Sequence, residues 1–244
     1  MRPNIPTLWS EIDRGAALAC RRALEGDDLL GALFAIEGAD RLRRIETVAR
    51  VQAWTAAVAA HPEDRVGALR AVLGRRLRVA PPLNPDPHAA FVSAVSGGSP
   101  GLPAIIASLW LVVARGAGVA VRPVALPGRL VLGTDDGRLL DPADEGAEMS
   151  ERALHTLRRQ LDQPARQPPC SMASIVDRAL RDLLFCGELA HDDITRFRAV
   201  SFLSHLHPDD PGPLVALGML AEGVGALAYA EALYERVDAR FPLT

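Results

Sequence analysis

The segment from Ala104 to Ala114, AIIASLWLVVA, most constrains the fold, because it has the length of a helix but no polar face. Pro103 precedes it and two glycines, Gly116 and Gly118, follow it, which favours a helix with these boundaries. A helix that is apolar on every side has to be buried on every side. Because the stretch is well short of the about 20 residues that span a bilayer, we expect it at the centre of a globular core.

The segments around this helix predict an α+β fold. Apolar residues recur at intervals of three and four from Leu8 to about Leu77, which indicates an N-terminal layer of helices. The proline-rich connection from Ala80 to His88 ends that layer. We expect a strand over Val119 to Leu126 and then a hairpin of Leu130–Leu132 and Arg138–Leu140 around the turn sequence Asp-Asp-Gly. The predicted organisation is a helical layer over 1–80, a core with a small antiparallel sheet over 81–160 and helices over 170–244.

Composition excludes several classes of function. The 244 residues carry a formal net charge of −3, and the arginine runs are short, so we expect no nucleic-acid partner. All 27 basic residues are arginines, which excludes a Schiff-base lysine and a phosphate-loop lysine and is typical of a GC-rich bacterial genome. The cysteines Cys20, Cys170 and Cys186 lie far apart, which favours neither disulfides nor structural zinc. We therefore expect a cytoplasmic protein without a membrane segment, a cofactor or a metal.

The last part of the chain has the spacing of a tetratricopeptide-like helical hairpin. Pro208 and Pro242 lie 34 positions apart (242 − 208), which is the period of such a unit. The residues between them have the types that such a unit requires: hydrophobic residues for packing, small residues where the two helices cross, a glycine at the turn and an aromatic residue. These positions are Leu214, Leu217, Gly218, Gly225, Ala230 and Tyr234. Stacked helix pairs bind helices or extended peptides. We therefore expect a protein or peptide partner at these C-terminal helices; the sequence leaves the oligomeric state open.

Several motifs in this order resemble the transglutaminase-like superfamily, in its SirB-type branch with a C-terminal tetratricopeptide-like hairpin. The resemblance covers most of the chain and rests on a G-x-P helix start, a V-x-x-P-G strand and an L-x-D-P strand. Its signposts are Gly101, Pro103, Gly118, Pro127, Gly128, Leu140, Asp141 and Pro142. It implies a papain-like α+β core between helical segments.

The resemblance also implies a catalytic triad, most of which this chain lacks. The superfamily places a cysteine at the N-terminus of the buried helix, a histidine directly after Pro-Gly and an acid on the next strand. Here Pro103 or Ile105 stands at the nucleophile position, Arg129 at the base position and Asp141 at the acid position. An arginine stays protonated and cannot act as a general base. We therefore predict no catalytic residue, and we expect Arg129 and Asp141 to form an ion pair.

Three hypotheses about function follow. The leading one is a catalytically inactive protein that acts as an interaction or regulatory module, with a vestigial site at Pro103, Ile105, Arg129 and Asp141. The alternative is an amide-processing enzyme, a hydrolase or transamidase, with a rearranged site; Arg129 anchoring a carboxylate or phosphate also stays open. A third is a structural subunit whose N-terminal layer packs on a partner.

A relocated nucleophile has two candidates. Ser108 lies about one turn into the buried helix, and we expect its hydroxyl to bond back to the helix. Cys170 follows two prolines and is expected to be the most exposed thiol, with His155 or His88 as the histidine that the fold could bring to it. Cys186, within LLFCGEL, is predicted to be a small buried residue.

The histidine-rich motifs have structural interpretations. His205 and His207 lie two positions apart beside Asp209 and Asp210, so on a helix they point to different sides and do not converge on a metal. We expect them at a helix C-terminus, where a histidine suits the dipole. In the motif from His191 to Asp193, one of the two aspartates is predicted to cap the following helix.

Overall fold

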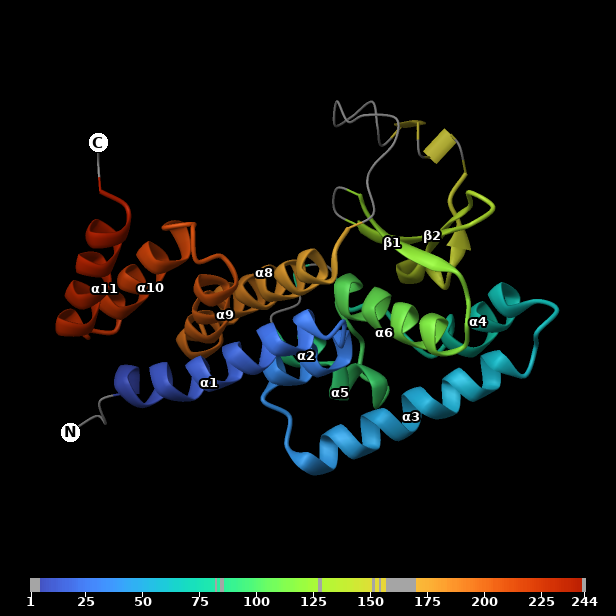
Figure 1. Cartoon of the computed structure of the whole chain (residues 1–244), viewed down its shortest axis with the longest axis horizontal. Coiled ribbons are helices and arrows are strands. Elements are labelled where there is room, and N and C mark those ends of the chain that lie inside the picture. The colour runs from blue at the N-terminus through green and yellow to red at the C-terminus, as the bar shows by residue number, and fades with distance from the viewer. Residues whose placement is uncertain are drawn as a thin grey trace. The chain divides into compact units, whose positions relative to one another are not determined.

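The computed structural model describes residues 5–81, 83, 86–126, 129–150, 152–153, 155–156 and 170–242, with side chains from Arg14 onward. These residues form two compact units (Figure 1). One unit contains Ala39–Pro82 and His88–Ala179, and the other contains Met1–Gly38, Leu83–Pro87 and Leu180–Thr244. The units interleave along the chain because they are defined by contacts in space; the division into three sequence segments stays a prediction.

The predicted α+β class is confirmed in the first unit, where helices accompany a four-stranded antiparallel sheet of order β1-β2-β3-β4. The strands are β1 (Val121–Leu126), β2 (Arg129–Thr134), β3 (Leu139–Asp141) and β4 (Ala147–Glu148). The helical elements are α3 (Arg41–Ala59), α4 (Arg65–Leu73), α5 (Val92–Ser96), α6 (Pro103–Gly116), the first part of α8 (Met172–Ala190) and the short 3₁₀ helices η1 (Pro87–Ala90) and η2 (Pro142–Asp144).

Helix α6 is the apolar helix of the sequence, and it is buried as predicted. Every residue from Ala104 to Leu111 is buried, and Trp110 is fully inaccessible. The helix contacts α3, α4 and α5 as well as β1, β2 and η2, so both helices and sheet cover it (Figure 1). Ser108 donates its hydroxyl hydrogen bond to the carbonyl of Ala104 at 2.7 Å, as expected for a serine bonded back to its own helix.

The hairpin of β2 and β3 follows from the chemistry of its turn. Gly137 has φ of +87°, a conformation that glycine adopts without strain. Asp136 accepts hydrogen bonds from the Thr134 hydroxyl and from Arg138, and Arg138 foremost holds the pKa of that carboxyl well below its ordinary value. The pairing of Leu132 with Leu140 then sets the register of the two strands.

The second unit is helical. It contains α1 (Ile5–Glu25), α2 (Leu29–Glu37), the rest of α8, α9 (Asp193–Leu206), α10 (Gly212–Gly223) and α11 (Leu227–Arg240). Helices α10 and α11 form a hairpin that turns at Gly225, whose φ is +77°. Gly218 lets the Tyr234 ring pack against α10, because a Cβ at this position would overlap the ring. The predicted hydrophobes Leu214, Leu217 and Ala230 are buried beside α9 or in the hairpin.

Aspartate side chains begin four helices in the two units. Asp28, Asp40 and Asp64 each accept a hydrogen bond from the backbone N–H three residues later, at 2.8–2.9 Å. Asp192 accepts from the N–H groups of Ile194 and Thr195, so it is the cap predicted in the His191–Asp193 motif. Within the described part of the chain, no helix combines the length and the apolar character needed to cross a bilayer.

We predict that Gly146→Ala destabilises the protein more than Gly137→Ala. Both glycines have positive φ, +74° and +87°, so a side chain costs about 1–2 kcal/mol of backbone strain at either position. A Cβ at residue 146 also overlaps the indole of the buried Trp110, whereas the space around residue 137 is open. We expect a further loss of about 1–3 kcal/mol at residue 146 in urea unfolding. Equal losses would contradict the packing of Trp110 under this turn.

Candidate functional site

Arg129 and Asp141 form the ion pair expected from the sequence. Arg129 begins β2 and Asp141 ends β3. Extending the register of Leu132 with Leu140 places Asp141 opposite Val131, so Arg129 is its diagonal neighbour on the same face. The Arg129 Nη1 donates a hydrogen bond to Asp141 Oδ2 at 2.6 Å. The side chain of Asp141 is 3% exposed and that of Arg129 is 52% exposed, so a buried carboxylate holds a half-exposed guanidinium.

Both oxygens of the Asp141 carboxylate are engaged in structure. While Oδ2 accepts from Arg129, Oδ1 accepts from the backbone N–H of Ala143 at 2.9 Å and caps η2. The carboxylate therefore links β2, β3 and η2. A guanidinium cannot take a proton from a nucleophile at neutral pH. This arrangement can bind an anion or hold the fold together, but it does not supply a base.

The first turn of α6 carries no nucleophilic side chain. Leu102 is the N-cap residue without a side-chain hydrogen bond, and Pro103 is the first helical residue. Ile105 is fully buried, and its backbone N–H donates to the carbonyl of Leu102 at 3.0 Å. The structure thus places Pro103 and Ile105 at the helix start, as predicted, where they contribute packing and not chemistry.

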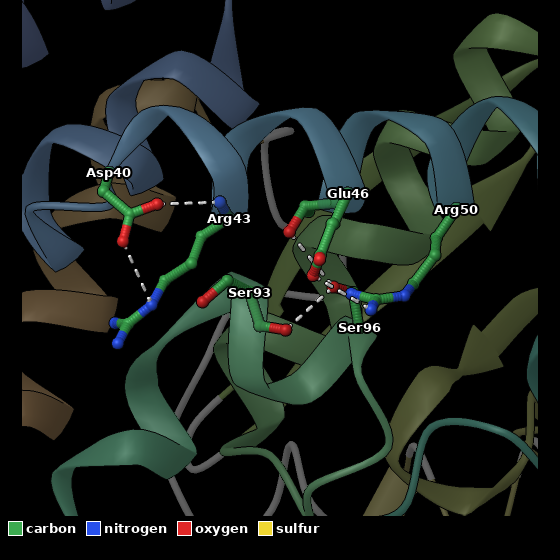
Figure 2. Close-up of polar contacts among 7 residues, drawn as sticks. Asp40, Arg43, Glu46, Arg50, Ser93 and Ser96 are labelled. Carbon is green, nitrogen blue, oxygen red and sulfur yellow. Dashed lines mark hydrogen bonds and ion pairs between the residues drawn. The ribbon is translucent and has the colours of Figure 1, made fainter.

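A polar cluster, which sequence reasoning missed, fixes the segment that leads into α6 (Figure 2). The Ser96 hydroxyl, at the end of α5, lies 3.0 Å from the carbonyl oxygen of Ser93 and 3.4 Å from the hydroxyl of Thr47 on α3. Arg78 donates to the carbonyl of Gly98 at 3.0 Å. Thr47 and Ser96 are buried. No imidazole or carboxylate bonds to these hydroxyls in the described residues, so the cluster positions a loop and does not activate a serine.

Burial raises the pKa of all three thiols, which lowers the fraction of reactive thiolate at neutral pH. Cys20 and Cys186 are buried, and burial raises the pKa of each to about 11. Cys170 is the most exposed of the three, as predicted, but partial burial raises its pKa as well. Its backbone N–H donates to the carbonyl of Pro123, which places it beside the edge strand β1. Among the described residues no hydrogen bond joins Cys170 to a histidine.

The C-terminal histidines have structural partners. His205 Nδ1 lies 2.8 Å from the carbonyl oxygen of Ser201 on its own helix, and His207 is the C-cap residue of α9. Asp210 accepts from the backbone N–H of Gly212. The described residues contain no group of three or more histidine, cysteine, aspartate or glutamate side chains placed to hold a metal ion.

Comparison with known proteins finds one family model that matches a large part of the chain. The model, described as the transglutaminase-like superfamily, matches residues 39–181. These residues coincide closely with the unit that contains α6, the sheet and the Arg129–Asp141 pair. No curated protein and no solved structure matches the chain.

We predict a measurable coupling between Arg129 and Asp141 in a double-mutant cycle of Arg129→Ala and Asp141→Asn. The asparagine keeps an acceptor for Ala143 but loses the charge that holds the guanidinium. Because Arg129 is half exposed and screened by solvent, we expect a coupling of only about 1 kcal/mol. Asp141→Ala removes the cap as well and should cost about 1 kcal/mol more. Chemical unfolding measures the four proteins of the cycle and Asp141→Ala; zero coupling would mean that the pair does not form in solution.

Proposed function

The chain belongs to the transglutaminase-like superfamily, and we propose that it is a member without amide chemistry that acts as a protein-interaction or regulatory module. The observation that carries this proposal is the residue directly after the Pro-Gly motif. The position of the general base holds Arg129, whose guanidinium is bonded to Asp141 at 2.6 Å. The acid that would orient an imidazole instead orients a permanent cation.

The start of α6 supports the same proposal. A thiol or hydroxyl at a helix N-terminus gains reactivity from the helix dipole and from free backbone N–H groups. The side chains in this turn are those of Pro103, Ala104 and Ile105, which have no reactive heteroatom. A protein with neither nucleophile nor base at these positions keeps the shape of the fold but not its covalent step.

The hairpin of α10 and α11 is the surface through which we propose that the module binds its partner. Four large apolar side chains are exposed on it: Val215 at 36%, Met219 at 63%, Val224 at 51% and Leu227 at 66%. Val215 and Met219 are one helical turn apart and therefore share a face of α10. Exposed acidic residues on α11, including Glu231 and Glu235, favour a partner with basic side chains beside apolar ones.

The finer classification is part of this proposal. The close packing of Gly218 on Tyr234 and the turn at Gly225 support a tetratricopeptide-like hairpin in a SirB-type member of the superfamily. The scattered cysteines, two of them buried as free thiols, support a cytoplasmic location.

We predict that the purified protein neither releases ammonia from glutamine-containing peptides nor transfers their acyl groups to an amine. The physical reason is that no described side chain at the base or nucleophile position can exchange a proton at neutral pH. An ammonia assay and mass spectrometry of the peptide measure both reactions, with an active transglutaminase as the positive control. An activity that Asp141→Ala abolishes would establish the alternative, an amide-processing enzyme with a rearranged site.

We predict that Met219→Asp abolishes binding of the partner protein. A tagged copy of the chain should capture a stoichiometric protein from its native cytosol, and a charge in the centre of the apolar face should abolish this capture. Ile194→Asp is the matched control, because Ile194 is also exposed (54%) but lies on α9. Mass spectrometry of the three captures measures the difference. Equal capture by wild type and Met219→Asp would show that the α10–α11 hairpin is not the binding surface.

A further inference from the structure

The outer face of α3 is uncharged and mostly apolar, although it faces solvent. Thr47, Val51 and Val58 form the buried face of this helix, which contacts α5 and α6. On the opposite side, exposed residues recur at intervals of three and four, and none of them is charged: Leu42, Ile45, Ala49, Gln52, Ala56 and Ala59. We call this set the α3 stripe. Leu42 is 65% exposed and Ile45 is 54% exposed.

The charged side chains of α3 that Figure 2 shows point away from the α3 stripe, toward the side of α5. Arg43 pairs with Asp40, and Arg50 bonds to Glu46 at 3.4 Å. A solvated helix usually carries such charges on the face opposite its core. The reversed arrangement leaves a surface about five turns long, from Leu42 to Ala59, along which the seam positions are uncharged and have the spacing of a coiled-coil seam.

We propose that the α3 stripe is a dimer interface, which packs against the α3 stripe of a second copy of this chain. The two α3 helices are antiparallel and related by a twofold axis. The argument is self-complementarity. Its two large apolar side chains, Leu42 and Ile45, lie toward its N-terminal end, and the small side chains of Ala56 and Ala59 lie toward its C-terminal end. An antiparallel copy therefore sets large against small at both ends of the pair. In the register that we propose, Leu42 lies opposite Ala59, Ile45 lies opposite Ala56 and Ala49 lies opposite Gln52. Each contact occurs twice, as a twofold axis requires.

Electrostatics favours the same orientation. An antiparallel copy brings the N-terminal turns of one α3, which carry Arg41 and Arg44, beside the C-terminal turns of the other. Arginines beside the negative end of a helix dipole are stabilising. In this register Glu46 lies opposite Thr55, so no like charges face each other. A parallel pair would place Arg41, Arg44 and Glu46 of both copies side by side.

A single helix pair buries less than a standard stable interface, which is about 1,200–2,000 Å² in total. We therefore expect a dimer that forms with rising protein concentration. Sedimentation equilibrium of the full chain should show a mass that rises from 26.1 kDa toward twice that value. Ile45→Asp should remain at the monomer mass at every concentration. Ile194→Asp, which changes an equally exposed isoleucine on α9, should behave as the wild type.

Cysteine pairing tests the register. In the Cys170→Ser background the other two thiols are buried. A mixture of chains that carry Ile45→Cys and chains that carry Ala56→Cys should form mixed disulfide dimers under mild oxidation. Ile45→Cys alone should form at least ten-fold fewer, because antiparallel copies separate the two Ile45 positions by eleven residues, roughly 16 Å along the helix, beyond the reach of a disulfide.

Three results would overturn the proposal. One is a monomer mass at every protein concentration, which is also the result expected if another part of the same chain covers the stripe. Another is a dimer that Ile45→Asp leaves intact. The third is a disulfide yield that is equal for Ile45→Cys alone and for the mixture. Circular dichroism verifies that Ile45→Asp keeps its helices, as expected for a side chain that is more than half exposed.

Discussion

The burial of α6 on all sides is the constraint on which the first unit depends. Because this helix has no polar face, three helices and two strands have to cover it, and they do. Strand β2 and the short helix η2, which carry or adjoin Arg129 and Asp141, are among its contacts. The geometry of the ion pair is therefore set by the packing of a hydrophobic helix. Side chains at the ends of these elements can change without loss of the core that positions them.

Features that depend on local sequence were predicted from it. The limits of α6, the hydroxyl of Ser108 bonded back to Ala104 and the cap at Asp192 follow from periodicity and from side chains within four residues of their partners. The Arg129–Asp141 pair was also expected, because the motifs that carry both residues are specific for adjacent strands. The interleaving of the two units was not predicted, because the contacts that define them join distant segments.

The polar contacts that fix the approach to α6 illustrate the same limit. Thr47 and Ser96 lie 49 residues apart, and each has a polar side chain that sequence reasoning places on a surface as readily as in a core. Cys170 was predicted to be the most exposed thiol, but its backbone bond to Pro123 beside β1 had no sequence signal. The amphipathic pattern of α3 did indicate a helix. It did not distinguish the face that packs in the core from the equally uncharged face that lies in solvent, because both have periods near 3.6 residues.

Asp141 has structural contacts that account for an aspartate at this position without any catalytic role. Its carboxylate caps η2 through the N–H of Ala143 and is nearly inaccessible to solvent, so a substitution leaves backbone donors and a neighbouring cation without a partner. Arg129 shares in this structure through its bond to Asp141, whereas Pro103 is a residue that the first turn of a helix accommodates readily. The proposal that the covalent chemistry is lost therefore rests on Arg129 and on the first turn of α6, whereas the contacts of Asp141 are explained by the fold.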